Sequence, residues 1–241
     1  MKSIVIIPTY NEKENIEGLI REIRTRSKHL SLDVLIVDSA SPDGTAEKVK
    51  QVQVNDPDLY LIEQKAKLGL GKAYWEGIEW AFKRNYECLI TMDADFSHDP
   101  KYLPDLIERT KEYDVVVGSR YIRGGKLKDW PLMRRCLSRF ANWYAKTLTG
   151  LPFFDLTSGF QCYRVEFLRK IMAYPIHAEG YAFLIELKYL ATVLGAKIGE
   201  IPIVFTDRKN GNSKISKKVI LESIFFVFRL ALQPKPKKIS Y

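Results

Sequence analysis

The 241-residue sequence has few cysteines, few histidines and no long apolar run. Cys88, Cys136 and Cys162 are widely spaced and form no C-x-x-C motif, which favours a reducing compartment and argues against a zinc site. No apolar stretch reaches the roughly 18 residues that a membrane-spanning helix needs. A strand-like run begins at Ser3, directly after the start, so we expect no signal peptide.

Two nucleotide-binding motifs are incomplete. Gly69-Leu70-Gly71 lacks the third glycine of a dinucleotide fingerprint and follows the third predicted strand instead of the first. Gly71-Lys72-Ala73 lacks the Ser or Thr with which a P-loop holds Mg²⁺. A tight turn between a strand and a helix is the preferred interpretation. No Ser-His-Asp or Cys-His arrangement can be assembled from spacing alone.

The composition is that of a soluble globular protein, with 46% hydrophobic and 28% charged residues. The formal net charge of +9 indicates an anionic partner, which leaves nucleic acid, a phosphorylated substrate or a lipid headgroup. Aromatic and basic residues do not alternate on one strand face as they do in RNA-binding sheets, so we expect no nucleic acid.

The first half of the sequence alternates between predicted strands and helices. The strands are expected at residues 3–7, 34–38, 59–62, 88–92 and 115–117. Asn11 with Glu14 predicts a capping box for the first helix. This alternation predicts an α/β fold with a mostly parallel, Rossmann-like sheet flanked by helices.

The second half of the sequence lacks this regular alternation of strands and helices. We expect a mobile loop at 121–129, a basic helix at 130–148, another helix at 181–194, and strand structure at 198–205 interrupted by Pro202. A flexible segment at 207–218, an apolar helix at 219–232 and a basic tail at 233–241 complete the chain. Without a domain-splitting linker, residues 1–232 are expected to form a single domain.

Polar residues stand where three predicted strands end. Tyr10 and Glu12 follow the first strand, Asp38 ends the second, and Asp93-Ala94-Asp95 follows the fourth. Taken singly, each is compatible with a cap or a turn. Because the carboxyl ends of parallel strands share one edge, together they predict a nucleotide pocket in which Tyr10 stacks on a base and Asp95 reaches a metal and a diphosphate. The second half supplies the cations, at Arg120, Arg134, Arg139, Arg208 and Lys214.

These motifs carry a resemblance to a known family. The motifs of the first half occur in the family's order: Val5 to Glu12, Asp38 with Ser41-Pro42-Asp43-Gly44-Thr45, Leu68 to Gly71, Met92 to His98 and Gly118 to Tyr121. They are followed by Ser138-Arg139, Asp155 to Phe160, Gly180-Tyr181, Ile201-Pro202-Ile203, Asp207-Arg208 and Gly211 to Lys214. Over residues 3–230, the sequence resembles the dolichyl- or polyprenyl-phosphate mannosyltransferases of glycosyltransferase family two. The later motifs are the more particular to polyprenyl-phosphate acceptors.

The resemblance implies a GT-A fold, a GDP-mannose donor, a Mg²⁺ or Mn²⁺ cofactor, and transfer with inversion to dolichyl or polyprenyl phosphate. By position, the donor would be bound by Pro8, Tyr10, Glu12, Asp38, Asp93, Ala94, Asp95 and Arg120, and the metal by Asp95 and Ser97. The acceptor phosphate would be bound by Arg134, Ser138, Arg208 and Lys214, and catalysis would fall to Asp93, Asp95, Arg120 and Arg208. Residues 1–120 would then be a nucleotide-binding half, and residues 121–218 an acceptor half.

The sequence departs from the family at Ser39 and Ala40, where a second Asp usually follows Asp38. This leaves open a UDP-glucose-dependent polyprenyl-phosphate glucosyltransferase, and more remotely a non-catalytic nucleotide-sugar binding protein. Like the family's short forms, the sequence has no membrane helices. The amphipathic helix at 219–232 is expected either to lie at an anionic membrane surface or to cover the sheet. We expect a peripheral protein of the cytoplasmic face, and leave open a separate membrane subunit.

Overall fold

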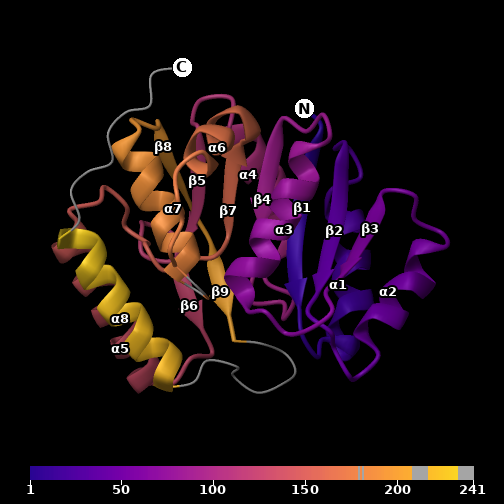
Figure 1. Ribbon diagram of the computed structural model, residues 1–241, viewed down its shortest axis with the longest axis horizontal. Coiled ribbons are helices and arrows are strands. Elements are labelled where there is room, and N and C mark those ends of the chain that lie inside the picture. Colours follow the sequence, from indigo (N-terminus) through magenta and orange to yellow (C-terminus); the bar gives the residue numbers. More distant parts are fainter. Residues whose placement is uncertain (179, 181, 208–216, 233–241) are drawn as a thin grey trace.

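The structure is a computed structural model that describes residues 1–178, 180, 182–207 and 217–232. Its centre is a seven-stranded sheet with the order β3-β2-β1-β4-β7-β5-β8, beside which lies a two-stranded sheet of β6 and β9 (Figure 1). The strands are β1 (Ser3–Thr9), β2 (Leu32–Asp38), β3 (Leu59–Glu63), β4 (Cys88–Thr91), β5 (Val115–Ser119), β6 (Lys126–Lys128), β7 (Gln161–Arg164), β8 (Ile198–Pro202) and β9 (Val204–Thr206).

Helices cover both faces of the large sheet. They are α1 (Lys13–Arg26), α2 (Thr45–Gln53), α3 (Leu70–Phe82), α4 (Leu103–Arg109) after a short 3₁₀ turn η1 (Pro100–Tyr102), α5 (Leu132–Thr149), α6 (Val165–Met172), α7 (Ala182–Val193) and α8 (Lys217–Leu232). Apolar residues of α1, α2 and α4 pack on one face, and those of α3, α6 and α7 on the other. The fold is therefore α/β with a mostly parallel sheet, as predicted.

The strands of the sheet are apolar because both of their faces are covered. In β1, Ile4 and Ile6 belong to one buried cluster, whereas Val5 and Ile7 belong to the other. A strand with two covered faces reads as a continuous apolar run, which is why the sequence predicted β1, β2, β4 and β5 at nearly their observed positions. Within the part of the chain that the structure describes, no helix is both long enough and apolar enough to cross a bilayer.

The predicted capping box at the start of the first helix is wrong. The helix begins one residue later than a cap at Asn11 requires, and its cap residue, Glu12, makes no capping hydrogen bond with its side chain. The reason is that tertiary contacts supply the partners instead: the Glu12 N–H donates to Thr45 Oγ1 (3.0 Å) and the Lys13 N–H to Asp43 Oδ2 (3.1 Å). Asn11 itself takes a positive φ of 54° in the turn.

Two strands were not predicted. Strand β7 inserts between β4 and β5 and is antiparallel to both. The short strand β6 lies within the segment expected to be a mobile loop, and pairs with β9. The predicted break at Pro202 is confirmed, because β8 ends there and β9 starts in the other sheet. Most of the segment 207–218 and the tail 233–241 lie outside the described residues.

Candidate active site

The predicted pocket residues do lie at one edge of the sheet. Strands β2, β1 and β4 are parallel neighbours, so the residues that follow Thr9, Asp38 and Thr91 emerge at the same side. Strand β5 runs in the same direction as β4, because both are antiparallel to the β7 that separates them. Arg120, directly after β5, therefore emerges at this edge too, which is where open α/β sheets bind their ligands.

Asp38 is buried at the end of β2, where the nucleoside of the donor is predicted to bind. Its carboxylate accepts hydrogen bonds from Thr9 Oγ1 (2.8 Å), from Ser41 Oγ (2.6 Å) and from the Ser41 N–H (2.9 Å). The same hydroxyl of Ser41 accepts from the Asn11 N–H (3.0 Å). Asp38 thus ties together the turns after β1 and β2, and its predicted contact with a nucleoside stays a prediction.

The other residues predicted at this end surround the same turn. Pro8 lies near the end of β1, and the Lys67 ammonium stands 3.7 Å from the centre of the Tyr10 ring. The carboxylate of Glu12 accepts from Asn15 Nδ2 (2.8 Å). A cation over an aromatic face is favourable, so Lys67 covers one face of the Tyr10 ring and leaves at most the other face for the predicted stacking on a base.

The departure at Ser39 has a structural counterpart. Ser39 Oγ donates to Gln64 Oε1 (2.8 Å), and Gln64 Nε2 donates to Glu76 Oε2 (2.9 Å). A carboxylate at position 39 would repel Glu76 across Gln64, or would require the Gln64 amide to turn around. The polar chain Ser39–Gln64–Glu76 thus replaces an acidic group at the ends of β2 and β3.

The Asp93-Ala94-Asp95 stretch forms a turn after β4 that is held by its own side chains. The Ser97 N–H donates to Asp95 Oδ1 (3.1 Å), and the Asp93 N–H donates to His98 Nδ1 (3.0 Å). Burial lowers the pKa of His98 to about 4, so the ring is neutral at pH 7 and its Nδ1 is able to accept. The imidazole packs against the rings of Phe160 and Phe205, whose centres lie 4.8 Å and 5.3 Å from its own, and these contacts fix its position.

A divalent cation fits this turn. Ser97 Oγ is buried and has no hydrogen-bond partner among the described residues, and it belongs to the same turn as the largely buried Asp95 carboxylate. Carboxylate and hydroxyl oxygens are hard ligands of the kind that Mg²⁺ and Mn²⁺ prefer. Among the described residues no cluster of three His, Cys, Asp or Glu side chains is arranged to hold a metal, so most ligands would have to come from a bound substrate and water.

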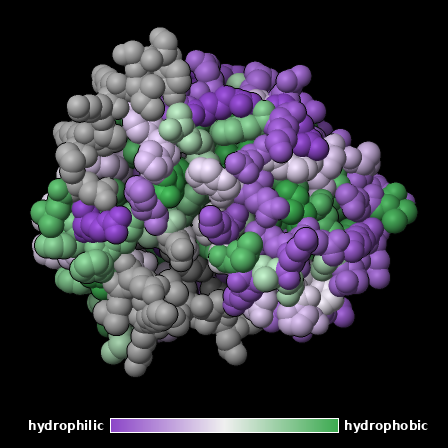
Figure 2. All heavy atoms as spheres, viewed as in Figure 1, coloured by the Kyte–Doolittle hydropathy of each residue, from purple (hydrophilic) through white to green (hydrophobic). Residues whose placement is uncertain are grey.

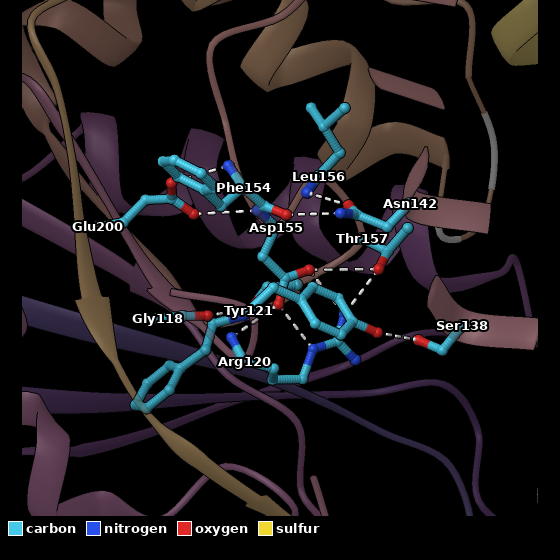
Figure 3. Close-up of polar contacts among 12 residues, drawn as sticks. Gly118, Arg120, Tyr121, Ser138, Asn142, Phe154, Asp155, Leu156, Thr157 and Glu200 are labelled. Carbon is cyan, nitrogen blue, oxygen red and sulfur yellow. Dashed lines mark hydrogen bonds and ion pairs between the residues drawn. The ribbon is translucent and has the colours of Figure 1, made fainter. Parts of the chain in front are cut away.

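Arg120 is largely buried and is held by Asp155 (Figure 3). Its Nε and Nη2 donate to the two carboxylate oxygens at 2.7 Å each, its backbone N–H donates to Asp155 Oδ2 (3.0 Å), and Nη2 also donates to Thr157 Oγ1 (2.6 Å). Burial alone would raise the pKa of Asp155, but the charge and hydrogen bonds of Arg120 outweigh it and lower that pKa below its ordinary value. Nη1 makes no hydrogen bond to a described residue.

The segment that carries Asp155 is clamped from several sides (Figure 3). Glu200 accepts from the Phe154 and Asp155 N–H groups (2.8 and 3.0 Å), and Asn142 of α5 bonds to the Phe154 carbonyl and to the Leu156 N–H. Side chains of β8 and α5 thus bond to three N–H groups and one carbonyl of this segment. Such a clamp fixes Asp155, and through it Arg120.

Lys188 completes the clamp from the interior of α7. Its ammonium nitrogen donates to the carbonyls of Leu156 and Ser158, each at 2.7 Å. Burial lowers the pKa of Lys188 to about 7, against the opposing charge of Asp155. Three of the charged residues of this clamp, Arg120, Asp155 and Lys188, are buried, and the half-buried Glu200 lies beside them.

Helix α5 brings two of the predicted acceptor residues to the same region. Ser138 Oγ lies 2.7 Å from the hydroxyl of Tyr121, the residue after Arg120. Arg134 Nη1 donates to Asp207 Oδ1 (2.7 Å) and its guanidinium stands 3.9 Å from the centre of the Trp130 ring. Arg208 and Lys214 lie outside the described residues.

A comparison with known families decides the classification. The family described as "Glycosyl transferase family 2" matches residues 4–172, well over half of the chain.

The chain belongs to glycosyl transferase family 2.

Its relatives confirm the predicted resemblance. An undecaprenyl-phosphate mannosyltransferase of Micrococcus luteus is 38% identical over 232 residues, which are 96% of this chain and 95% of the relative. A polyprenol monophosphomannose synthase of Mycolicibacterium smegmatis is 39% identical over 228 residues, which are 94% of this chain and 85% of the relative. These similarities establish the chain as a glycosyltransferase.

Solved structures confirm the GT-A-type fold. A glucosyl-3-phosphoglycerate synthase of Mycobacterium tuberculosis, crystallised with Mn²⁺, UDP and phosphoglyceric acid, superposes with a TM-score of 0.68 at 17% identity, covering 97% of this chain and 79% of its own. A mannosyltransferase of Pyrobaculum calidifontis, crystallised with GDP-Man and Mn²⁺, superposes with a TM-score of 0.60 at 19% identity, covering 95% and 72%. At these identities, the likeness concerns the fold alone.

The family motifs did not point to all of the residues that shape this site. Lys188 and Glu200 stand outside the motifs that carry the resemblance. A signal for Lys188 was nevertheless present, because Lys188, like Glu186, interrupts an otherwise apolar run from Ala182 to Ala191, which the structure shows to be buried throughout. A lysine inside such a run has to find internal acceptors. Glu200 gave no comparable signal, since acidic residues are common in strands at sheet edges.

Proposed function

We propose that this glycosyltransferase transfers mannose from GDP-mannose to the phosphate of dolichyl or another polyprenyl phosphate, with inversion at the anomeric carbon. The observation that carries the proposal is the turn after β4, which holds the Asp95 carboxylate and a buried Ser97 hydroxyl that has no hydrogen-bond partner among the described residues, two oxygen groups suited to a divalent cation. The names of the two relatives support the acceptor and the sugar.

The proposed reaction needs no general base. A phosphate monoester has a second pKa of about 6 and is therefore largely dianionic at neutral pH. One of its oxygens attacks the anomeric carbon of the mannosyl group while the bond from that carbon to the diphosphate oxygen breaks, and GDP leaves with the electron pair. One displacement of this kind inverts the anomeric centre and gives a β-linked mannosyl phosphate.

The residues of this chain act by binding and by charge. Pro8, Tyr10, Glu12 and Asp38 would hold the guanosine, and Asp93 would lie beside the ribose or the sugar. The donor and acceptor phosphates are both anionic and have to approach each other, so cations that bind them are needed. Phosphates of the donor and acceptor would be bound by Arg120, Arg134, Arg208, Lys214 and Ser138. Asp95 and Ser97 would hold Mg²⁺ or Mn²⁺, which when bound stabilises the charge that develops on the leaving diphosphate.

A donor screen tests this proposal. The purified chain is incubated with a short polyprenyl phosphate, Mg²⁺ or Mn²⁺, and either GDP-mannose or UDP-glucose, and the lipid-linked sugar and its anomeric configuration are measured. We expect mannosyl transfer from GDP-mannose with inversion. Transfer from UDP-glucose alone would instead favour the glucosyltransferase alternative. The reason to test this alternative is Ser39, which stands where the family usually has a second acidic residue near the expected nucleoside.

The carboxylate roles are tested by Asp95→Asn, with Asp105→Asn on the exposed side of α4 as the matched control. We expect the first variant to lose at least 100-fold in turnover, the scale on which single electrostatic groups act in transition states, and the control to keep its activity. Unchanged turnover and metal dependence in Asp95→Asn would show that the metal role assigned to Asp95 is wrong.

A further inference from the structure

The residues expected to bind the donor and the acceptor come from different parts of the molecule. Asp95 belongs to the turn after β4, whereas Arg134 and Ser138 stand on α5 at one end of the molecule (Figure 1). Figure 2 shows mainly hydrophilic side chains over β1 to β3 and their helices, and hydrophobic ones along the margin at α8, which packs on α5. The two parts have to be held at a fixed distance, because a misplacement of about 1 Å can cost about 100-fold in rate.

Phe205 of β9 lies between these parts. Its ring centre is 5.3 Å from that of His98 and 5.5 Å from that of Trp130, and the ring planes cross at 76° and 84°. The guanidinium carbon of Arg120 stands 5.2 Å from the centre of the same ring. Edge-to-face ring pairs at such distances are attractive, and so is a cation near an aromatic face. Phe205 thus contacts the turn after β4, the end of β5 and the segment that precedes α5.

Two neighbours of Phe205 act directly on residues of the candidate site. His98 Nδ1 accepts from the Asp93 N–H (3.0 Å) and thereby fixes the turn after β4. The Trp130 ring faces the Arg134 guanidinium, which stands 3.9 Å from the ring centre. We call the three rings of His98, Phe205 and Trp130 the ring column. The ring column runs from the proposed cation turn to a residue expected to bind the acceptor phosphate.

The strand that carries Phe205 is held from two sides. In the two-stranded sheet, Phe205 pairs with Leu127 of β6. The N–H of the preceding residue, Val204, donates to the hydroxyl of Tyr102 in η1 (2.9 Å). Strand β9 is therefore tied to a segment after β5 and to a segment after β4. This backbone support gives the half-buried Phe205 ring a fixed place between the two parts of the site.

We propose that Phe205 is a positioning residue that sets the distance between the cation turn after β4 and the first turn of α5. Its ring does so because it contacts His98, Arg120 and Trp130 at once. The inference rests on the proposed function, since it concerns the step in which the acceptor phosphate meets the donor. Phe205 stands outside the motifs that carry the family resemblance, and it acts through its neighbours instead of binding a substrate itself.

The test compares two substitutions of Phe205. Phe205→Leu keeps a large apolar side chain but removes the ring, and Phe205→Tyr restores the ring. The matched control is Phe82→Leu at the end of α3, which removes a half-buried ring that also has an arginine over it, with the Arg169 guanidinium 4.3 Å from the ring centre. The kcat and the KM values for GDP-mannose and a short polyprenyl phosphate are measured with Mn²⁺, and urea unfolding compares the stabilities.

We expect Phe205→Leu to lower kcat at least tenfold and to change KM for GDP-mannose less than threefold. The reason is that its neighbours shift relative to each other, while the residues expected to hold the nucleoside stay in place. Phe205→Tyr and Phe82→Leu should keep kcat within threefold of the wild type. Unchanged kcat in folded Phe205→Leu, or an equal loss in Phe205→Tyr, would overturn the proposal.

A double-mutant cycle shows whether the ring column acts as one unit. Trp130→Leu breaks the column at its next ring, so it should also lower kcat at least tenfold. Because contacting residues are not additive, Trp130→Leu/Phe205→Leu should lose little more than the worse single variant. Losses that multiply would mean that the two rings act independently, which contradicts the proposal. If Phe205→Leu does not fold, Trp130→Leu decides, and an unchanged kcat there refutes the ring column.

Nuclear magnetic resonance separates this inference from the proposed function, because it needs no turnover. His98 is one of three histidines, and both its ring signals and the Asp93 amide signal depend on where the imidazole lies. These signals should shift in Phe205→Leu, return in Phe205→Tyr and stay unchanged in Phe82→Leu. A wild type that transfers no sugar but shows these shifts refutes the proposed function only. An active wild type whose signals are unmoved by Phe205→Leu refutes the positioning role only.

Discussion

Replacing Asp155 by Asn should destabilise the protein strongly. The substitution conserves shape but removes the charge that faces Arg120, whose side chain is 6% exposed, and three N–H groups that donate to the carboxylate lose much of their electrostatic partner. Breaking a buried ion pair by removing one partner typically costs about 3–5 kcal/mol. The nearby ammonium of Lys188 adds to the effect, because it loses the favourable charge of Asp155 and keeps that of the half-buried Glu200.

The assay is urea unfolding at pH 7, followed by circular dichroism and tryptophan fluorescence. The matched control is Glu112→Gln, which removes the same charge from the exposed pair between Arg109 and Glu112, 3.2 Å apart. Exposed pairs contribute about 0–1 kcal/mol, so the control should unfold almost like the wild type. Since small domains have only about 5–15 kcal/mol of stability, the difference between the two variants should be plain in the midpoints.

A double variant shows whether the cost arises from the unpaired charge. Arg120→Met/Asp155→Leu removes both charges and should be less destabilised than Asp155→Asn, because a buried apolar pair carries no desolvation penalty. If Asp155→Asn unfolds at the same urea concentration as Glu112→Gln, then Asp155 does not hold Arg120 by a buried ion pair, and the clamp described here has no energetic role.

Three further outcomes follow from the packing and the buried charges. Burial lowers the pKa of Lys188 from 10.5 to about 7, so the unfolded chain binds the proton more tightly than the folded protein does. The free energy of unfolding should therefore rise between pH 7 and pH 9.5, by at most about 1.4 kcal/mol per pH unit. This rise should be absent from Lys188→Met. Gly77→Ala should destabilise by about 1–3 kcal/mol in urea unfolding, although Ala favours helices by about 1 kcal/mol, because the new Cβ would stand 2.7 Å from Ile6 Cγ2. Thiol labelling of the folded protein should modify exposed Cys136 alone, and urea should release the other two thiols.

Much of the fold could be predicted because local pattern and tertiary environment agree. The apolar runs of β1, β2, β4 and β5 are buried on both faces, so their composition alone located them. The convergence of Tyr10, Asp38 and Asp95 at one edge followed from the parallel alternation. The antiparallel strand β7 was not predictable in this way, because Gln161 to Arg164 has no distinctive run and owes its conformation to pairing with β4 and β5.

The sequence by itself determined the alternation of strands and helices, the family, and the chemical types of the residues at the strand ends. Only the tertiary structure decided which charged and polar residues contact one another. Arg120 and Asp155 are 35 positions apart, and Lys188 reaches the same segment from a third element. The physical reason is that a charge finds its partner through burial: once α7 covers the sheet, Lys188 leaves water and has to bond to the nearest carbonyls, which no local pattern in the sequence specifies.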